Sequence, residues 1–422
     1  MAEVRPFRGL RYASNPTVRL GDLVCPPYDV ISPTERQALA GRSPYNAVHL
    51  ELPEGGSEER YATAARHLAK WRQNGVLATD ERPSYYVVRH RFPHLNEQWE
   101  RWELTVLVRL EEFERRIVLP HEETTSGPKA DRLRLMEACN ANLSPVMCAY
   151  QDPEGLIRNG MEHVMGTPPD SVAEDGDGSE MAQWVVDASE LYDAVQSVLA
   201  DAPLFIADGH HRYETAIRYR DLARQRAGRW QEQDTFNFAM VTLIDFDDPG
   251  LLVLPYHRTL GHMDPPTLTA VRNRLLEVFQ IQTFETQPTS PKALEEAVVR
   301  EGRGTSLGLL GPDGEGPYLL TLKGASSEGG LWESEGWVLH QEVLEPVLRD
   351  ALSDYITYAH DPVEAWESVV EGREQMAFFL KSFPMDLFQA VVSAGQRLPP
   401  KSTYFHPKLP TGMVFNLLEG EV

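Results

Sequence analysis

The sequence predicts an α/β protein with mixed sheets, and three observations lead to this prediction. Short apolar runs bounded by turn residues, such as residues 204–207, are typical of buried strands. Segments with helical spacing of apolar residues, such as residues 58–73, alternate with these runs. The chain has 422 residues, of which 42% are hydrophobic, so it is long enough to bury the cores of two or three domains.

The predicted elements fall into two parts. We expect strands at residues 46–50, 85–92, 99–110, 117–120 and 236–245, and helices at residues 58–73, 128–139, 184–199 and 210–226. These belong to a larger N-terminal domain, residues 1–262, which carries the candidate site. After residue 262 shorter helices and strands alternate, and they predict a smaller α/β domain over residues 263–422.

The net charge limits the classes of partner. Lys and Arg number 40 and Asp and Glu number 63, so the formal net charge is −23. A chain this acidic is not expected to bind a nucleic-acid backbone, which needs basic patches. A local group of arginines and backbone amides still attracts a nucleotide, because exposed charges more than about 8 Å away are largely screened at physiological salt.

Cysteine usage and hydropathy indicate the compartment. The three cysteines, Cys25, Cys139 and Cys148, stand in apolar settings without metal-ligand spacing, so we expect buried, reduced thiols. No stretch approaches the ~18 apolar residues of a membrane span, and the first residues lack the apolar core of a signal peptide. We therefore expect a cytoplasmic protein with no membrane partner, and the oligomeric state stays undetermined.

Residues 203–219 carry the strongest functional signal. A predicted strand at residues 204–207 is followed by the turn Asp208-Gly209 and by a helix that begins at His210. We expect Asp208 to cap this helix, because its carboxylate can accept a hydrogen bond from an amide of the first turn. Gly209 lets a ligand approach the backbone, since it has no side chain.

The first turn of this helix is rich in hydrogen-bond donors. His210, His211 and Arg212 stand where acidic side chains usually complement the helix dipole. The planar guanidinium of Arg212 matches phosphate oxygens, and free amides at a helix start bind phosphate. These features favour an anion-binding site over the alternative, in which the histidines make only surface or interdomain hydrogen bonds.

A second cluster follows the predicted strand at residues 117–120. His121 and Glu122 come directly after it, and they are able to bind a metal or to act as acid and base. The zinc-protease pattern is excluded, because no second histidine stands four residues after His121. Lys129 and Arg132 are able to reach phosphate. A helix start with ordinary salt bridges is the alternative.

Three further segments contain candidate residues. In residues 25–32 two prolines stiffen a loop with Tyr28, Asp29 and Ser32, which either faces a ligand or forms a structural turn capped by Asp29. Near the C-terminus, residues 399–409 include Lys401 and Ser402 on a proline-stiffened segment that we expect to close over the site. In the third segment His257 and Arg258 end a predicted strand, and we interpret them as a pair on the surface.

These blocks, taken in order, resemble the bacterial and archaeal family called domain of unknown function 1015. The matching blocks cover nearly the whole chain: residues 5–12, 26–32, 121–132, 142–145, 207–216, 255–258 and 399–409. Leu398 departs from the family, which usually has methionine before the two prolines, and the acidic stretch near residues 170–180 is peculiar to this chain. The family name implies no activity.

A more distant resemblance rests on one pentapeptide, Asp208-Gly209-His210-His211-Arg212. It is similar to the phosphate-binding turn of the superfamily that contains the partition protein B nuclease-like domain, sulfiredoxin and the archaeal free-serine kinase. In that superfamily the turn holds nucleotide phosphates at a helix N-terminus. The resemblance implies a nucleotide-dependent phosphotransferase that acts on a small hydroxylated metabolite, serine being the first candidate, with ATP or ADP and Mg as cofactors.

This resemblance gives each candidate a role. The phosphates would be held by the turn and by two cations of the second cluster: Gly209, His210, His211, Arg212, Lys129 and Arg132. The catalytic groups would be Asp208, His210, His211, Glu122 and Asp29, with Asp208 and Glu122 also as magnesium ligands. The substrate would be bound by Tyr28, Ser32, His121, Lys401 and Ser402.

Two alternatives remain beside this hypothesis. The first is a phosphatase or metal-dependent hydrolase that uses the histidines and carboxylates of both clusters as ligands or as acid and base. The second is a non-catalytic switch that binds a nucleotide and turns over no acceptor.

Overall fold

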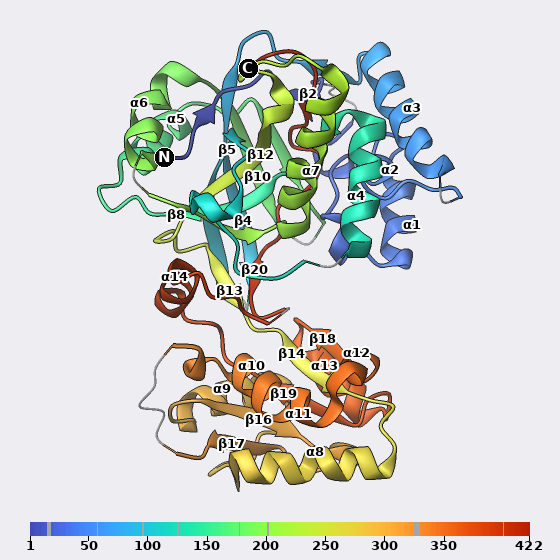
Figure 1. The fold of residues 1–422 in the computed structure, drawn as a ribbon, viewed down its shortest axis with the longest axis vertical. Helices are drawn as coiled ribbons and strands as arrows, with labels where there is room; N and C mark the ends of the chain where they lie inside the picture. The colour runs from blue at the N-terminus through green and yellow to red at the C-terminus, as the bar shows by residue number, and fades with distance from the viewer. Residues whose placement is uncertain are drawn as a thin grey trace. The chain divides into compact units, whose positions relative to one another are not determined.

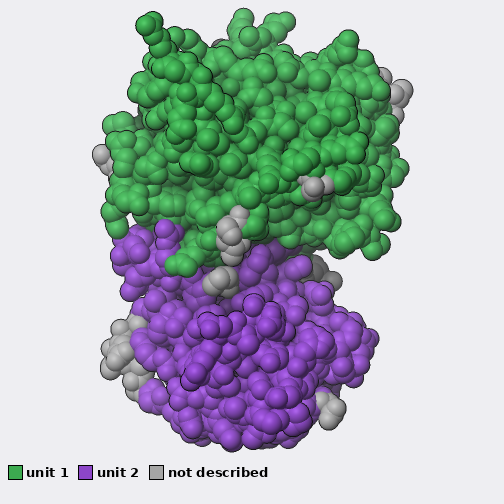
Figure 2. Space-filling model, turned by 45° about the vertical axis from the view of Figure 1, so that its right-hand side comes forward, with its two compact units in different colours: residues 1–252, 407–422 green, residues 253–406 purple. Residues whose placement is uncertain are grey.

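The computed structural model describes residues 1–14, 18–56, 58–94, 97–124, 126–176, 178–200, 202–324, 330–399 and 401–422. The chain divides into two compact units: unit 1 contains residues 1–252 and 407–422, and unit 2 contains residues 253–406 (Figure 2). Both units combine helices with a sheet, so the prediction of a mixed α/β protein is confirmed. No helix within the described residues has the length and apolar character needed to cross a bilayer.

Unit 1 is built on a nine-stranded mixed sheet with the order β6-β11-β8-β12-β5-β4-β10-β9, and β1 pairs with β5 (Figure 1). Its strands are β1 (Val4–Arg5), β4 (Ser84–His94), β5 (Glu97–Arg109), β6 (Val118–Leu119), β8 (Val146–Tyr150), β9 (Ser171–Glu174), β10 (Glu180–Asp187), β11 (Leu204–Asp208) and β12 (Phe238–Asp245). β11 runs parallel to β6 and antiparallel to β8. The predicted strands at 85–92, 99–110, 117–120 and 236–245 are thereby confirmed.

Both faces of this sheet are buried, in keeping with the alternation of side chains along a strand. On one face Val106, Cys148 and Ile206 belong to a core that includes α5 (Leu156–Met165) and α6 (Ala188–Leu199). On the opposite face Leu107 and Met240 pack with apolar side chains from both ends of the chain. All three cysteines are buried and free, as predicted.

The remaining helices of unit 1 are α1 (Pro33–Arg42), α2 (Val48–Glu51), α3 (Glu59–Gln73), α4 (Ser126–Cys139) and α7 (His210–Ala227). α3 packs against α4, and α4 packs against α7, so the three lie side by side (Figure 1). The predicted helices at 58–73, 128–139 and 210–226 are confirmed. The predicted helix at 184–199 begins only at Ala188, because β10 pairs with β4 up to Asp187.

The predicted strand at residues 46–50 is wrong, because this segment turns into the short helix α2 (Val48–Glu51). The buried side chain of Asn46 fixes the turn: its amide donates to the carbonyl of Asp22 at 2.9 Å, and its oxygen accepts from the amide of Val48 at 2.9 Å. A short buried apolar run has the same pattern in a strand and in a helix, so periodicity alone could not distinguish them.

Unit 2 contains a six-stranded sheet in the order β15-β17-β16-β19-β14-β18, with antiparallel pairing between neighbours. Its strands are β14 (His257–Leu260), β15 (Phe279–Thr283), β16 (Ser306–Leu310), β17 (Tyr318–Leu322), β18 (Ile356–Ala359) and β19 (Met376–Phe379). Its helices are α8 (Pro265–Val278), α9 (Pro291–Glu301), α10 (Glu335–Val338), α11 (Glu345–Leu348), α12 (Leu352–Tyr355), α13 (Pro362–Val370) and α14 (Met385–Ser393), with a π-helical turn at Leu339–Leu344.

Helices cover both faces of the unit 2 sheet. Leu309 and Met376 face a core that includes α8 and the π-helical turn. Leu310 and Ala377, the next residues along the same strands, face a second core that includes α9 and α13. This alternation gives unit 2 three layers, helix on sheet on helix.

Residues 407–422 return to unit 1 and run through it. Arg101 donates to the carbonyl of Pro407 at 2.8 Å, and Thr411 exchanges two backbone hydrogen bonds with Cys25. Further on, β21 (Asn416–Leu417) pairs with β7 (Ala141–Asn142). The last segment therefore contacts Cys25 and residues 141–142, which belong to or adjoin two of the blocks selected from the sequence. The compact units change at residues 252–253 and 406–407, whereas the sequence predicted a single boundary at residue 262.

Candidate functional site

The pairing of β6 with β11 brings the two sequence clusters together. These strands are parallel, with Val118 opposite Leu204, so the residues that follow each strand meet at one edge of the sheet. The backbone amide of His121 donates to Nε2 of His210 at 3.2 Å, and the two rings pack edge to face with centroids 4.5 Å apart. Nε2 of His210 thus accepts a hydrogen bond from the backbone of the second cluster.

The helix that follows β11 is not capped by Asp208, and this prediction is wrong. Gly209, with φ of +92°, is the N-cap residue of α7, and no side chain caps the helix. The carboxylate of Asp208 instead forms ion pairs with two cations, the guanidinium of Arg212 on α7 and the ammonium of Lys408 from the C-terminal segment. One buried carboxylate is therefore shared by two buried cations.

The two cations set the charge of Asp208. Burial by itself raises the pKa of this carboxyl, but the nearby charges of Lys408 and Arg212 lower the pKa well below its ordinary value. For Arg212, burial lowers the pKa, and the charges of Asp208 and Asp29 more than offset this effect, so its pKa is raised. Asp208 and Arg212 are consequently both charged at neutral pH.

The guanidinium of Arg212 lies directly against the turn. A Cβ atom added at Gly209 would stand 3.0 Å from Nε of Arg212 and 3.1 Å from Cζ, so only glycine allows this approach. The terminal nitrogens of Arg212 bond to Asp208 and to the carbonyl of Pro145. Nε has no hydrogen-bond partner among the residues that the structure describes. The turn thus presents a buried, fixed guanidinium with a donor still available.

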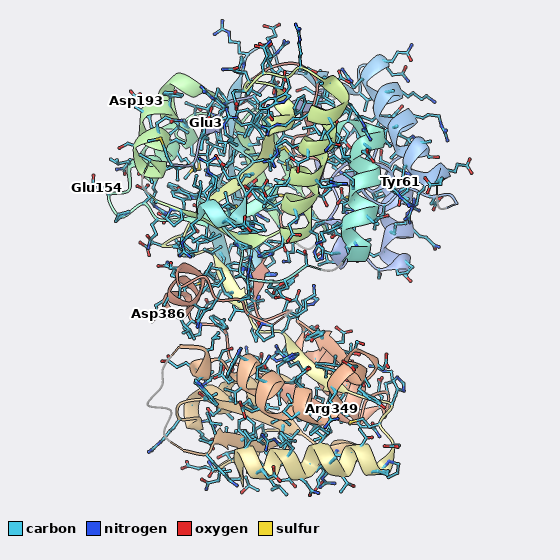
Figure 3. The ribbon with its side chains drawn as sticks, in the orientation of Figure 1. Glu3, Tyr61, Glu154, Asp193, Arg349 and Asp386 are labelled. Carbon is cyan, nitrogen blue, oxygen red and sulfur yellow. The ribbon has the colours of Figure 1, made fainter. Side chains whose placement is uncertain are left out.

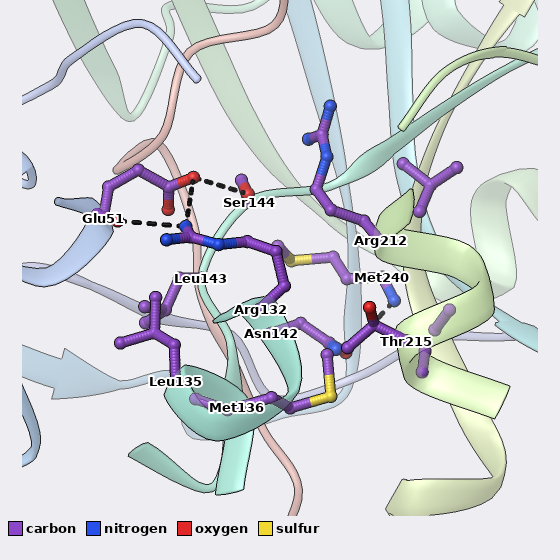
Figure 4. A pocket seen from close by; sticks show the side chains of 14 residues that line it. Glu51, Arg132, Leu135, Met136, Asn142, Leu143, Ser144, Arg212, Thr215 and Met240 are labelled. Carbon is purple, nitrogen blue, oxygen red and sulfur yellow. Dashed lines mark hydrogen bonds and ion pairs between the residues drawn. The ribbon is translucent and has the colours of Figure 1, made fainter. Parts of the chain in front are cut away.

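A small cavity adjoins Arg212 between α4, α7 and residues 141–146 (Figure 4). Its volume is about 40 Å³, which is room for ~3 water molecules. Besides Arg212, the polar side chains on its wall are Glu51, Arg132, Asn142, Ser144 and Thr215. The cavity is too small for a nucleotide base, so it suits only the end of a ligand.

Glu51 is a site residue that the sequence analysis missed. Its side chain is 1% exposed, and Oε1 accepts from the hydroxyl of Ser144 at 3.3 Å and from the amide of Tyr28 at 3.4 Å. The same oxygen lies 3.6 Å from Nη1 of Arg132 (Figure 4). Oε2 has no hydrogen-bond partner within the described part of the chain. The available signal was a glutamate inside an apolar run, which the assignment of a strand at 46–50 obscured.

Arg132 joins the loop at residues 25–32 to this cavity. Its guanidinium stacks on the ring of Tyr28, with Cζ 4.2 Å from the centroid, and donates to the carbonyl of Glu51 at 3.0 Å. Burial, followed by the charge of Asp29, raises the pKa of Tyr28 to about 12, so the phenol is neutral. Arg132 is in turn held by Asp131, which also accepts from Tyr61 of α3 (labelled in Figure 3).

The other candidates of the two clusters lie close by. Lys129 forms an ion pair with Glu214 of α7 at 2.8 Å. Half-buried Glu122 approaches His121, with Oε1 3.7 Å from Nε2, and half-buried His211 lies in the first turn of α7. In the described residues no three His, Cys, Asp or Glu side chains are arranged to hold a metal ion.

Other candidates are exposed or belong to unit 2. Ser32 is exposed and caps α1, accepting from the amide of Glu35 at 3.2 Å, and Asp29 is also exposed. Lys401 and Ser402 belong to unit 2, so their expected closure over the site stays a prediction. The lysine that reaches Asp208 is Lys408, from the same predicted segment.

The interpretation of His257 and Arg258 as a surface pair is wrong. Both lie in β14 of unit 2, and their side chains are fully buried. Nε2 of His257 lies 3.2 Å from a carboxylate oxygen of Glu295, and Arg258 donates to the carbonyl of Tyr256 at 2.9 Å.

Comparison with known proteins places the chain in a family. A family model described as "Protein of unknown function (DUF1015)" matches residues 4–344, and no curated protein matches the chain. Three solved structures align with 74% of this chain: a conserved hypothetical protein from Pyrococcus furiosus (TM-score 0.38, 16% identity, 95% of its own chain), a free serine kinase in complex with AMP (0.37, 16%, 91%) and SbnI with C-terminal truncation from Staphylococcus aureus (0.39, 9%, 87%). All three TM-scores are low.

The close approach at Gly209 predicts the effect of a methyl group there. We expect Gly209→Ala to lower the free energy of unfolding by about 1–3 kcal/mol for the backbone strain, plus a further loss because the methyl displaces Arg212. Gly228→Ala is the matched control, since Gly228 at the other end of α7 also has positive φ, +66°, but no atom within 4 Å of an added Cβ. Denaturant unfolding of both variants is the measurement, and equal losses would contradict the packing of Arg212 on the turn.

The depressed pKa of Asp208 predicts a pH-dependent contribution to stability. We expect Asp208→Asn to cost about 3–5 kcal/mol at pH 7, because two buried cations lose their partner. Since the pKa is lowered on folding, the advantage of the wild type is full above about pH 5 and shrinks as the pH falls below about 4. Unfolding curves from pH 7 to pH 3 test this, with Asp221→Asn, a half-buried aspartate on the same helix, as control. A constant gap between wild type and variant would refute the lowered pKa.

Proposed function

This chain belongs to the family described as Protein of unknown function (DUF1015), and we propose that its unit 1 is a nucleotide-dependent phosphotransferase acting on a small hydroxylated metabolite. One observation carries the proposal: Asp208 is shared by Arg212 and Lys408 at the N-terminus of α7. An incoming phosphate can take the place of the carboxylate beside either cation. Phosphate also suits the unpaired amides at a helix start, where the dipole favours negative charge.

The phosphate half of the site consists of the turn and the cations beside it. Gly209 permits a close approach of phosphate oxygens to the backbone, and Arg212 offers donors in a planar fork. His210 and His211 supply further donors at the first turn. Lys408 would neutralise charge that develops on the transferred phosphoryl group. In phosphoryl transfer, positioning and electrostatic stabilisation provide most of the rate enhancement.

The proposed nucleotide is ADP or ATP with magnesium. Magnesium usually keeps several waters and binds through phosphate oxygens and one or two carboxylates, so it needs no cage of protein ligands. Asp208 is already paired with two cations, which leaves Glu122 as the better candidate for a magnesium ligand. The base of the nucleotide would lie outside the 40 Å³ cavity.

The acceptor half is assigned to the cavity beside Arg212. Among the carboxylates, Asp208 is paired with two cations and Asp29 is exposed, whereas Glu51 is buried with an available oxygen. The acceptor hydroxyl would give its proton to Oε2 of Glu51 while its oxygen forms a bond to phosphorus. The bond from phosphorus to the bridging oxygen of the nucleotide breaks, and its electron pair leaves with the nucleotide. Serine is the first acceptor to test.

Nucleotide binding should depend on Arg212. We expect ADP or ATP with magnesium, at a hundred times its dissociation constant, to stabilise the wild type by about 2.7 kcal/mol in a thermal-shift assay. Arg212→Ala should abolish this shift, whereas Arg218→Ala, an exposed arginine on the same helix, should retain it. Pyrophosphate in the same thermal-shift assay measures how much of the stabilisation comes from the phosphates alone. If no nucleotide raises the melting temperature of the wild type, both the phosphotransferase and the nucleotide-switch hypotheses fail. The hydrolase hypothesis is then tested by analysing the metal content of the purified protein.

Turnover should depend on Glu51 while nucleotide binding does not. We expect Glu51→Gln to lower kcat by about 10²–10⁴-fold, the usual contribution of a general base, and to keep the nucleotide shift. The measurement is phosphorylation of serine and other small alcohols with the nucleotide identified above. Glu54→Gln is the control, because this neighbouring glutamate is largely exposed. Unchanged turnover in Glu51→Gln would remove Glu51 from the reaction.

A further inference from the structure

Unit 2 contains a cavity that the proposed phosphotransferase does not use. It has a volume of about 190 Å³ and lies where α8 crosses the sheet. Its walls are mainly apolar and include Leu275, Ile281, Leu309 and Met376. An engineered apolar cavity of about 150 Å³ binds benzene, so this volume is sufficient for a six-carbon ring.

The cavity exists because α8 covers this part of the sheet incompletely. Leu275 is buried in the core, but the next residue, Leu276, is 54% exposed and lies at the edge of the cavity. The floor is formed by Leu309 of β16 and Met376 of β19, both nearly completely buried. The cavity is open to solvent at this edge, so an apolar ligand bound there would remove the apolar side chains of its wall from water.

Polar groups gather on one side of this cavity. The carboxylate of Glu315 accepts from Nη2 of Arg272 at 3.2 Å and from the hydroxyl of Tyr318 at 3.2 Å. Both oxygens of Glu315 are therefore in use. The bond to Glu315 is the one side-chain hydrogen bond of Arg272 within the described residues, so its guanidinium retains further donors.

The pair between Arg272 and Glu315 can also yield to a ligand. The two side chains are 51% and 49% exposed, and exposed ion pairs contribute little to stability. The loop that carries Glu315 is fixed by its backbone, because the amide of Gly311 donates to the carbonyl of Glu315 at 2.7 Å. The backbone of the loop is thus held in place, while the side-chain contact between Glu315 and Arg272 is weak enough to yield.

We propose that this cavity binds a small carboxylic acid with an apolar body, such as an aromatic acid. The apolar body lies against Leu309 and Met376, and the carboxylate binds the guanidinium of Arg272. A guanidinium binds a carboxylate through two parallel N–H donors, which fixes the orientation of the acid. A neutral analogue and an amine both lack this ion pair with Arg272. The proposal concerns unit 2 alone and is independent of the nucleotide site.

Titration calorimetry of the full chain with benzoate, benzyl alcohol and benzylamine tests the proposal. We expect benzoate to bind with Kd of about 1 mM or lower, and the two analogues to bind at least about tenfold more weakly. Arg272→Gln should weaken benzoate binding about tenfold or more, whereas Arg300→Gln, another exposed arginine of unit 2, should not change it. Absence of benzoate binding, or equal binding of benzylamine, would overturn the proposal.

A cavity-filling variant locates the apolar body. Leu309→Phe places a ring in the void, and we expect it to retain the melting temperature of the wild type while it abolishes benzoate binding. Ile281→Phe fills the same void from β15 and serves as the second variant if Leu309→Phe does not fold. Wild-type affinity for benzoate in a folded filling variant would show that the acid binds elsewhere and would refute the assignment.

Discussion

The arrangement of unit 1 depends on one buried carboxylate that two cations share. Asp208 ends β11, Arg212 lies in the first turn of α7, and Lys408 comes from the C-terminal segment. Each group is buried, and a buried charge is tolerated only when it is paired. The trio therefore fixes three separate parts of the chain at one point. It also concentrates positive charge locally within a protein whose formal net charge is −23.

The sheet determines which residues can join this trio. Parallel pairing of β6 with β11 places His121 beside His210, and the antiparallel neighbour β8 brings the carbonyl of Pro145 to Arg212. These contacts do not depend on the sequences of the loops that follow the strands. They follow from the direction of three adjacent strands, which brings the carboxyl ends of two and the amino end of the third to one edge.

Local features were predictable from the sequence, and long-range ones were not. The strand, turn and helix around Gly209 follow from spacing and composition, and so do the helices α3 and α4. The pairing of Asp208 with Lys408 could not be predicted, because this lysine is 200 residues away and competes with the local capping bond. Glu51 was missed for a related reason: its burial beside Ser144 depends on tertiary packing, and the apolar run around it fits a strand or a helix equally well.

The return of residues 407–422 to unit 1 has a consequence for biosynthesis. A ribosome that has completed residue 252 still has to synthesise residues 253–406, which takes roughly 10–30 s at about 5–20 residues per second. During this interval Asp208 and Arg212 exist without Lys408, and β7 exists without its partner β21. Unit 2 can thus fold before the site of unit 1 is complete. A prematurely terminated chain would contain every motif of the central turn and still lack the lysine that completes it.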